Sequence, residues 1–334
     1  GDLSKLVDAS DPFSNPGSAI LVSAPGSNIK STANLLENHN GSTFGGDFES
    51  TQGTSFSAPI TSGVVALMLE ANPYLAYRDV QEILAKTARI IDDENTVWLK
   101  NGDTTVNDGS GMHYSEDYGF GIIDAHSAVR MAEIWDEINN SINESSIISS
   151  NNSSQAILDN SEISSTINVN SDIDIEHVEV FVDIDHTRIG DLIITLVSPD
   201  GTESILVNRP GKTPGSDDSD VGLEQSGLKF NLSTTNSFGE NGTGDWILKV
   251  KDAATGETGT LNSWDLKLYG QKDEGNDDYI FTDEFADSNG RTISDTDGKD
   301  SINTVSILTD STINLNAGSH SNIAGKIVHI DSNT

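Results

Sequence analysis

The heptapeptide Gly53-Thr54-Ser55-Phe56-Ser57-Ala58-Pro59 leads directly into residues 58–70, which are apolar on every side. Pro59 falls in the first turn of a helix, where its missing N–H costs no hydrogen bond, so the pattern predicts a core helix that ends at Asn72-Pro73. Ser55 then lies at the helix start, where the helix dipole stabilises an oxyanion and Gly53 permits a sharp turn. Taken alone, the heptapeptide equally fits an ordinary helix cap, because Thr, Ser and Pro are common at such positions.

The residues around this helix mix strand and helix patterns. Residues 19–22 (Ala-Ile-Leu-Val) predict a short buried strand that ends at residues 24–26 (Ala-Pro-Gly), and helical spacing recurs twice further along the chain. The first of these sets is Val80, Ile83, Leu84, Thr87 and Ala88, and the second is Ala125, Ala128, Val129, Ala132 and Trp135. Residues 1–138 are therefore expected to form an α/β domain.

The composition excludes several classes of partner. The chain has 334 residues, enough for two or three domains, and 53 acidic against 18 basic residues give a formal net charge of −35. This charge repels nucleic acid and anionic membrane surfaces, and it favours a soluble extracellular protein, expected to be a monomer. Cysteine is absent, which excludes disulfides and thiolate metal sites and fits a secreted bacterial protein. The first residues, Gly-Asp-Leu-Ser-Lys, lack the pattern of a signal peptide, so the chain is expected to begin in mid-protein or after processing.

The second half of the chain changes in character. Residues 139–160 are rich in Asn and Ser without a stable period and predict a linker. A period of two follows, which predicts an antiparallel β-sandwich over residues 161–271. The alternating apolar residues are Val178, Val180, Val182 and Ile184, then Trp246, Leu248 and Val250, then Trp264, Leu266 and Leu268. Residues 272–334 predict short β-strands, at residues 304–308 and 312–315, and a truncated end.

Several motifs together resemble the subtilase family of serine proteases, of the kexin-like proprotein convertase type. Residues 24–26 resemble the segment before the nucleophile, residues 53–59 the nucleophile motif, residues 69–73 with 78–81 the helix pair after it, and residues 118–125 the closing motif of the catalytic domain. The sandwich resembles the convertase P domain in residues 187–192, 196–202, 244–246 and 261–264. In that domain Arg188, Asp191, Trp246 and Trp264 are candidates for scaffold roles.

The resemblance implies a subtilisin-like catalytic domain, of which this chain carries the C-terminal half, and a secreted endopeptidase with Ser55 as the acylating nucleophile. It hints at cleavage after basic residues. The family also needs a histidine, an aspartate and an asparagine for the oxyanion hole, which precede the serine. No such motif precedes Ser55 here, since His39 lies in a polar loop and His113 and His126 follow the serine. The alternative is a non-catalytic extracellular binding protein built from a degenerate protease half, a P domain and a calcium-binding module.

The last segment is similar to the C-terminal domain of serralysin-type exported proteases, which stack calcium-binding turns in a β-roll. The residues that carry this likeness are 295–302, 313–318 and 319–325. The complete nonapeptide repeat is missing, and Asp297-Gly298-Lys299-Asp300 matches it only in part. The likeness implies Ca²⁺ as a cofactor, without identifying its ligands.

Overall fold

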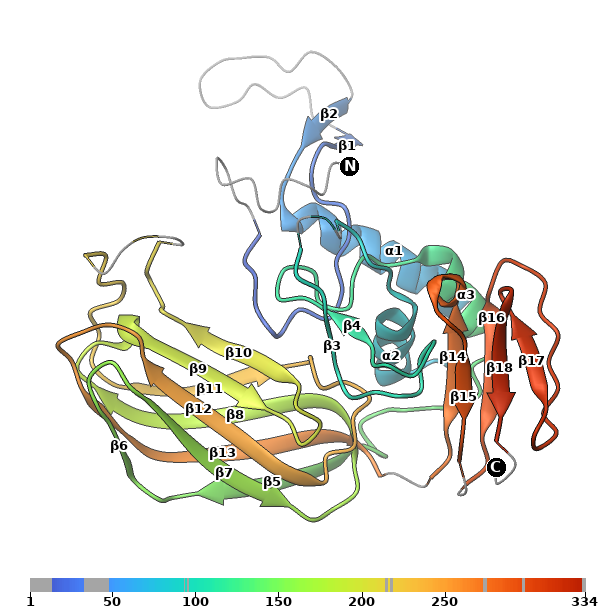
Figure 1. The fold of residues 1–334 in the computed structure, drawn as a ribbon. Coiled ribbons are helices and arrows are strands. Elements are labelled where there is room, and N and C mark those ends of the chain that lie inside the picture. Colours follow the sequence, from blue (N-terminus) through green and yellow to red (C-terminus); the bar gives the residue numbers. More distant parts are fainter. Residues whose placement is uncertain are drawn as a thin grey trace.

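The computed structural model describes residues 14–32, 48–92, 94, 96–213, 216, 219–272, 275–295 and 298–331. These residues form three units, which are called here the N-terminal unit (residues 14–138), the sandwich (residues 145–271) and the C-terminal unit (residues 275–331). Figure 1 shows the sandwich lying on one side of the N-terminal unit and the C-terminal unit on the other. Among the described helices, none is both long enough and apolar enough to cross a membrane.

Three helices dominate the described part of the N-terminal unit, at the places that the sequence predicts. They are α1 (Thr54–Ala71), α2 (Tyr77–Thr87) and α3 (Ala125–Ile134). Met68 of α1, Ile83 of α2 and Met131 of α3 are fully buried in one shared cluster. Two short antiparallel pairs complete these elements: β1 (Ile29–Thr32) with β2 (Phe48–Thr51), and β3 (Leu99–Lys100) with β4 (His113–Tyr114).

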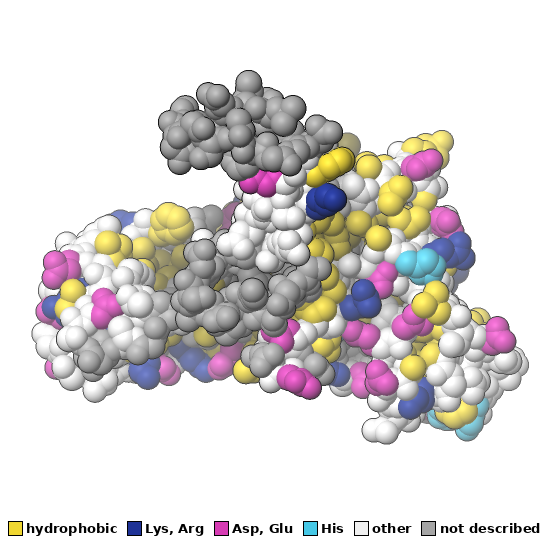
Figure 2. Space-filling model, turned by 90° about the horizontal axis from the view of Figure 1, so that it is seen from above, with side chains coloured by type: hydrophobic (Ala, Val, Ile, Leu, Met, Phe, Trp, Pro, Cys, Tyr) yellow, Lys and Arg dark blue, Asp and Glu magenta, His cyan; other side chains and the backbone are white. Residues whose placement is uncertain are grey.

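Two expectations about this unit differ from the structure. The buried strand predicted at residues 19–22 is only partly buried and is not a regular strand. Among the described residues, the pairing at this place is an isolated bridge from the next residue, Ser23, to Ile122. The all-apolar helix α1 buries only Val64 and Met68, while Leu67 and Leu69 are 50% and 40% exposed. Helix α3 packs on one face of α1 and no described residue covers the opposite face. Figure 2 accordingly shows hydrophobic side chains gathered where α1 lies.

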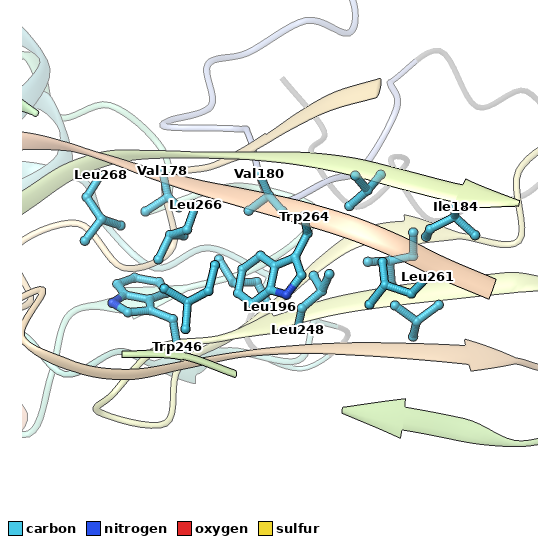
Figure 3. Packing of buried hydrophobic residues seen from close by; sticks show 14 of the residues in the cluster. Val178, Val180, Ile184, Leu196, Trp246, Leu248, Leu261, Trp264, Leu266 and Leu268 are labelled. Atoms are coloured by element: carbon cyan, nitrogen blue, oxygen red, sulfur yellow. The ribbon is translucent and has the colours of Figure 1, made fainter. Parts of the chain in front are cut away.

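The predicted β-sandwich is present. One sheet has the strand order β10-β9-β12-β7 and the other β11-β8-β13-β5, with antiparallel pairing throughout. The inward-facing residues of both sheets fill one core, in which Trp246 and Trp264 are fully buried between the sheets, as Figure 3 shows. The strands of the sandwich are β5 (Ser145–Asn151), β6 (Gln155–Ile157), β7 (Glu162–Val169), β8 (Asp174–His186), β9 (Leu192–Val197), β10 (Glu203–Asn208), β11 (Leu228–Thr234), β12 (Gly244–Asp252) and β13 (Gly259–Gln271), with a 3₁₀ turn, η2 (Ile189–Asp191), before β9.

The interpretation of residues 139–160 as a linker was wrong for most of that stretch. Strands β5 and β6 lie within it and both pair with β13, from Ser145 opposite Gly270 to Ile157 opposite Gly259. Ile157 is fully buried in the core. Backbone pairing with β13 orders these residues more than apolar side chains do. A strand held in this way needs few apolar residues, so its composition resembles that of a linker.

The C-terminal unit is rich in β-strands, as expected. β14 (Asp278–Thr282) pairs in parallel with β16 (Ser301–Ser306), and β18 (Lys326–Ile330) lies between β15 (Arg291–Ile293) and β17 (His320–Ile323). A 3₁₀ helix, η3 (Asp283–Asp287), follows β14 and buries Phe285 against Phe281. The strand predicted at residues 304–308 corresponds to the end of β16, whereas residues 312–315 contribute only a bridge from Thr312 to Asn322. The β-roll stays a prediction.

Candidate active site

The turn before α1 places Ser55 at the N-terminus of that helix. Gly53 precedes the helix with φ 139° and ψ 152°, a conformation that residues with a side chain rarely adopt. The N–H of Phe56 donates to Gly53 O at 3.0 Å and closes the first turn around Ser55. The first N–H groups of a helix lack partners within it and lie at the positive end of the dipole, so this turn offers donors to an anion beside Ser55.

The Ser55 turn is tied to residues 24–26, the segment that the resemblance places before the nucleophile. Gly53 N–H donates to Gly26 O at 2.8 Å. This bond lies at the base of the antiparallel β1–β2 pair, in which Ile29 is opposite Thr51. Two motifs that are 27 residues apart in the sequence, counted from Gly26 to Gly53, are thus neighbours in the structure.

The motif at residues 118–125 positions this segment from the other side. Phe120 N–H donates to Leu21 O at 2.8 Å, and Ser23 N–H donates to Gly121 O at 2.7 Å. Gly119 has φ 60°, and a Cβ atom on it would lie 2.4 Å from Ile20 O. The two backbones approach this closely only because residue 119 has no side chain. Residues 20–26, and through Gly26 the Ser55 turn, therefore depend on the glycines of this motif.

No described histidine serves Ser55. Ser55 is exposed, and among the described residues its Oγ has no hydrogen-bond partner. His113 Nδ1 lies instead 3.4 Å from Glu284 Oε2 of the C-terminal unit, and His126 is exposed on α3. The other described histidines lie in the sandwich (His177 and His186) and in the C-terminal unit (His320 and His329), while His39 lies outside the described residues. The described part of the chain therefore presents a candidate nucleophile without a proton acceptor.

Ser55 begins the exposed face of α1. Pro59, Ser62, Ala66 and Leu69 follow at intervals of three or four residues and are also exposed. These side chains are small or apolar, so the face is suited to close packing and not to water. Any part of a protein that covers this face lies against Ser55 as well.

The described residues do not provide an obvious metal site. They contain no group of three or more His, Asp or Glu side chains that could hold a metal ion. In the partial calcium motif, Asp300 Oδ1 accepts the N–H of Asp277 at 3.2 Å and Lys299 N–H donates to Asn276 Oδ1 at 2.8 Å. Asp297 lies outside the described residues. Calcium binding therefore stays a prediction from the sequence.

Arg78 is a residue whose role the sequence did not reveal. Its guanidinium makes a two-pronged ion pair with Glu176, with Nε 2.6 Å from Oε2, and this pair joins α2 to β8 of the sandwich. The Arg78 side chain is 1% exposed. A signal was present, because an arginine in the first turn of a helix opposes the helix dipole and indicates a partner elsewhere. The scaffold roles expected of Trp246 and Trp264 agree with their burial in the core.

Comparison with known proteins matches two parts of the chain to protein families. Residues 7–121 match the subtilase family and residues 175–268 match the proprotein convertase P-domain. Protease KEX1 of Kluyveromyces lactis is 34% identical over 272 residues, which cover 78% of this chain and 32% of that protein. Kexin of Saccharomyces cerevisiae is 35% identical over 229 residues, which cover 66% of this chain and 26% of kexin. The chain thus spans about a third or less of the length of these relatives.

Two solved structures resemble the fold. The serine protease of Aeromonas sobria in complex with its chaperone superposes with a TM-score of 0.64 at 26% identity, covering 78% of this chain and 55% of that one. A second structure of the Aeromonas sobria serine protease gives a TM-score of 0.54 at 27% identity, covering 67% of this chain and 45% of that one. The similarity spans more of the chain than either the N-terminal unit or the sandwich alone.

Proposed function

From the premise that the chain joins a subtilase-family region to a kexin-like P domain, we propose that it is part of a secreted serine endopeptidase with Ser55 as its nucleophile. The observation that carries this proposal is the Ser55 turn, which holds an exposed hydroxyl at the start of α1 beside Gly26. The reaction that such a turn suits is acyl transfer, because a hydroxyl lies beside backbone N–H groups that have no partner within the helix.

In the proposed reaction Ser55 Oγ attacks the carbonyl carbon of a peptide bond. Its proton passes to a base and from there to the leaving amine as the C–N bond breaks. Water then attacks the acyl-enzyme. The base takes a proton from this water and passes it to Ser55 Oγ as the ester bond breaks and the acid product leaves. Backbone N–H groups at the start of α1 stabilise the oxyanion in both steps. The base has to come from outside the described residues, where His39 and any further chain lie.

The exposed face of α1 supports a reaction in which Ser55 is the nucleophile and another segment supplies the base. Because Ser55 lies at one end of that face, a protein segment that covers Leu69 and Ala66 would bring its own side chains toward the hydroxyl. We expect the histidine and the aspartate of the triad to come with such a segment. Cleavage after basic residues and action outside the cell belong to the same proposal, the latter supported by the formal net charge of −35 and the absence of cysteine.

Covalent labelling tests the proposal. The full protein is treated with a fluorophosphonate probe, which reacts with activated serines, and is compared with Ser55→Ala and with Ser57→Ala. We expect Ser55→Ala to lose labelling. Ser57→Ala is the matched control, because it removes another serine hydroxyl from the same turn, and it should keep its labelling. Labelling that persists without the Ser55 hydroxyl rules the nucleophile out.

A second function is favoured by the lack of any described proton acceptor near Ser55. In that case the chain is a non-catalytic binding protein with the same architecture. Absence of labelling in the folded wild-type protein supports this alternative, provided that a known serine protease labels under the same conditions.

A further inference from the structure

A groove lies where the N-terminal unit meets the sandwich, away from Ser55. It measures about 480 Å³, and its walls include Tyr77 of α2, Glu144 before β5, His177 and Glu179 of β8, and Tyr269 of β13. Ligand pockets commonly have volumes of this order and commonly form at domain boundaries. No residue of α1, β1 or β2 lines the groove.

The walls of the groove are held in place by the ion pair described above. Arg78 and Glu176 bond in two places, and Arg78 also donates to Asn140 O at 3.0 Å and to Asn143 Oδ1 at 3.2 Å. These contacts fix α2 and the segment before β5 against β8. The groove is thus formed before any ligand arrives, which lowers the entropy cost of binding.

The groove is aromatic and acidic. Tyr269 OH donates to Glu179 Oε2 at 2.9 Å, and Tyr77 OH donates to Glu144 Oε1 at 3.5 Å. The carboxylate of Glu176, which also faces the groove, forms an ion pair with Arg78. Glu144 and Glu179 form no ion pair with an arginine among the described residues, although the charge of Arg78 acts on Glu144 and that of Lys267 acts on both. Burial lowers the pKa of His177, although Glu179 and Glu144 act against this, so the imidazole adds no positive charge near neutral pH.

Tyr269 already shows how a cation is accommodated here. The Lys267 ammonium lies 4.2 Å from the centroid of the Tyr269 ring. The His177 ring also packs against Tyr269, and the centroids of the two rings are 5.6 Å apart. Tyr77 is 51% exposed and leaves its ring open to the groove. Aromatic faces next to carboxylates suit a guanidinium group, which stacks and forms charge-assisted hydrogen bonds at the same time.

We propose that this groove binds an arginine side chain of a peptide, at a place remote from the bond that Ser55 attacks. The proposal deepens the proposed function, because it names a feature of the peptide substrate. Glu144 and Glu179 supply the negative charge, and Tyr77 supplies the free aromatic face. Binding here needs no catalysis, so it can be measured when the Ser55 hydroxyl is absent.

The test uses the full protein in a Ser55→Ala background, in which a peptide cannot be consumed. A fluorescent peptide with two adjacent arginines is compared, by fluorescence anisotropy, with the same peptide carrying citrulline, the neutral isostere of arginine. We expect the arginine peptide to bind about tenfold more tightly, and the double variant Glu144→Gln, Glu179→Gln to lower that preference about fivefold relative to Ser55→Ala alone. Any arginine preference that belongs to the cleft at Ser55 is the same in both proteins and cancels in this comparison.

The matched control is Glu203→Gln, which removes a carboxylate from β10, where Glu203 pairs with Lys249 at 2.7 Å outside the groove. It should leave the arginine preference unchanged. Equal affinity for the arginine and citrulline peptides overturns the proposal. So does an arginine preference that is as large in the double variant as in Ser55→Ala alone, at an unchanged melting temperature. Failure of Ser55 to label with fluorophosphonate does not bear on these measurements, so the two proposals fail separately.

Discussion

Tyr279 has one hydroxyl proton and two carboxyl neighbours. Its oxygen lies 3.0 Å from Asp277 Oδ2 and 3.0 Å from Asp295 Oδ2. A hydroxyl donates a single hydrogen bond, so the second contact is favourable only if one carboxyl group is protonated. Burial, followed by the hydrogen bond with Asp295, raises the pKa of Asp277 to about 6. The pair therefore shares a proton under mildly acidic conditions.

This shared proton predicts a pH dependence for the C-terminal unit. The folded pKa of Asp277 lies above its value of about 4 in an unfolded chain, so its contribution to stability is complete below pH of about 4. It is lost as the pH rises through about 6. The change Asp277→Asn removes that loss, because the amide donates to Asp295 at every pH. We expect the variant to be more stable than wild type by about 1 kcal/mol at pH 8, a value discounted for partial exposure.

The measurement is the melting temperature of the transition that includes the C-terminal unit, between pH 4.5 and pH 8. Asp310→Asn is the matched control, since Asp310 is exposed on a loop of the same unit. The control should follow the wild-type pH profile. If Asp277→Asn follows it as well, Asp277 does not carry the shared proton.

At the scale of single residues, the sequence predicts those features that neighbouring residues in the chain determine. The helix start at Ser55 is confirmed, because a glycine, small polar residues and a proline before an apolar run specify it within one turn. The nucleophilic role of Ser55 stays a prediction. The contact of Tyr279 with Asp295 was not predicted, because Asp295 follows β15 and the chain brings it back to β14 across 16 residues.

Among the elements, the motif at residues 118–125 offers the sharpest test. The change Gly119→Ala places a Cβ atom 2.4 Å from Ile20 O and 2.5 Å from Leu21 O, both backbone atoms that cannot rotate away. We expect a loss of about 3 kcal/mol or more in the free energy of unfolding, from the clash and from the positive φ together. Fluorophosphonate labelling of Ser55 should fall too, because residues 20–26 carry the Ser55 turn. Chemical denaturation and the labelling assay measure the two effects.

The variant Gly318→Ala separates the cost of the positive φ from the cost of the Cβ clash. Gly318 has φ 73°, yet a Cβ atom there meets nothing within 4 Å. It should cost only about 1 kcal/mol, the price of a left-handed backbone alone. A similar loss for both variants would mean that the close approach at Gly119 is relieved by backbone movement.

Strands β5 and β6 show where composition misleads. In β5 the residues that face inward are Ser145, Ile147, Ser149 and Asn151, so only one of the four is apolar. A strand of this kind gains little from burial and owes its order to the ladder with β13. By contrast, the alternation from Val178 to Ile184 places four fully buried side chains in the core and makes β8 readable from the sequence.

For the molecule as a whole, two arginines bind across the boundaries between the three units. The ion pair of Arg78 with Glu176 joins the N-terminal unit to the sandwich. Arg291 of β15 joins the C-terminal unit to residues 104–107 by donating to Thr104 O at 2.5 Å, to Thr105 O at 3.3 Å and to Asn107 O at 3.1 Å. Both arginines bind across a boundary between units, and sequence periodicity says nothing about such contacts.

The last prediction concerns Arg291→Met. The methionine can still pack against Tyr279, whose ring centroid lies 4.7 Å from the guanidinium carbon, but three backbone carbonyls lose their donor. We expect the docking of the C-terminal unit to weaken by about 2–4 kcal/mol, since charged hydrogen bonds are worth more than neutral ones. The amides of Asn107 and Ile280, which bond across the boundary to Ile280 O and Thr105 O, should then exchange with solvent about a hundredfold faster.

Amides within β8 report on the sandwich and should keep their protection, because Arg291 does not contact that sheet. Arg130→Met is the matched control, since within the described part of the chain Arg130 pairs only with the neighbouring Glu133 on an exposed turn of α3, with the arginine side chain 47% exposed. Unchanged exchange at Asn107 in Arg291→Met would show that the apolar contact of Ile280 with α2 and α3 holds the unit in place without the guanidinium. Faster exchange everywhere, including β8, would instead mean that the three units unfold as one, and that Arg291 stabilises the whole molecule.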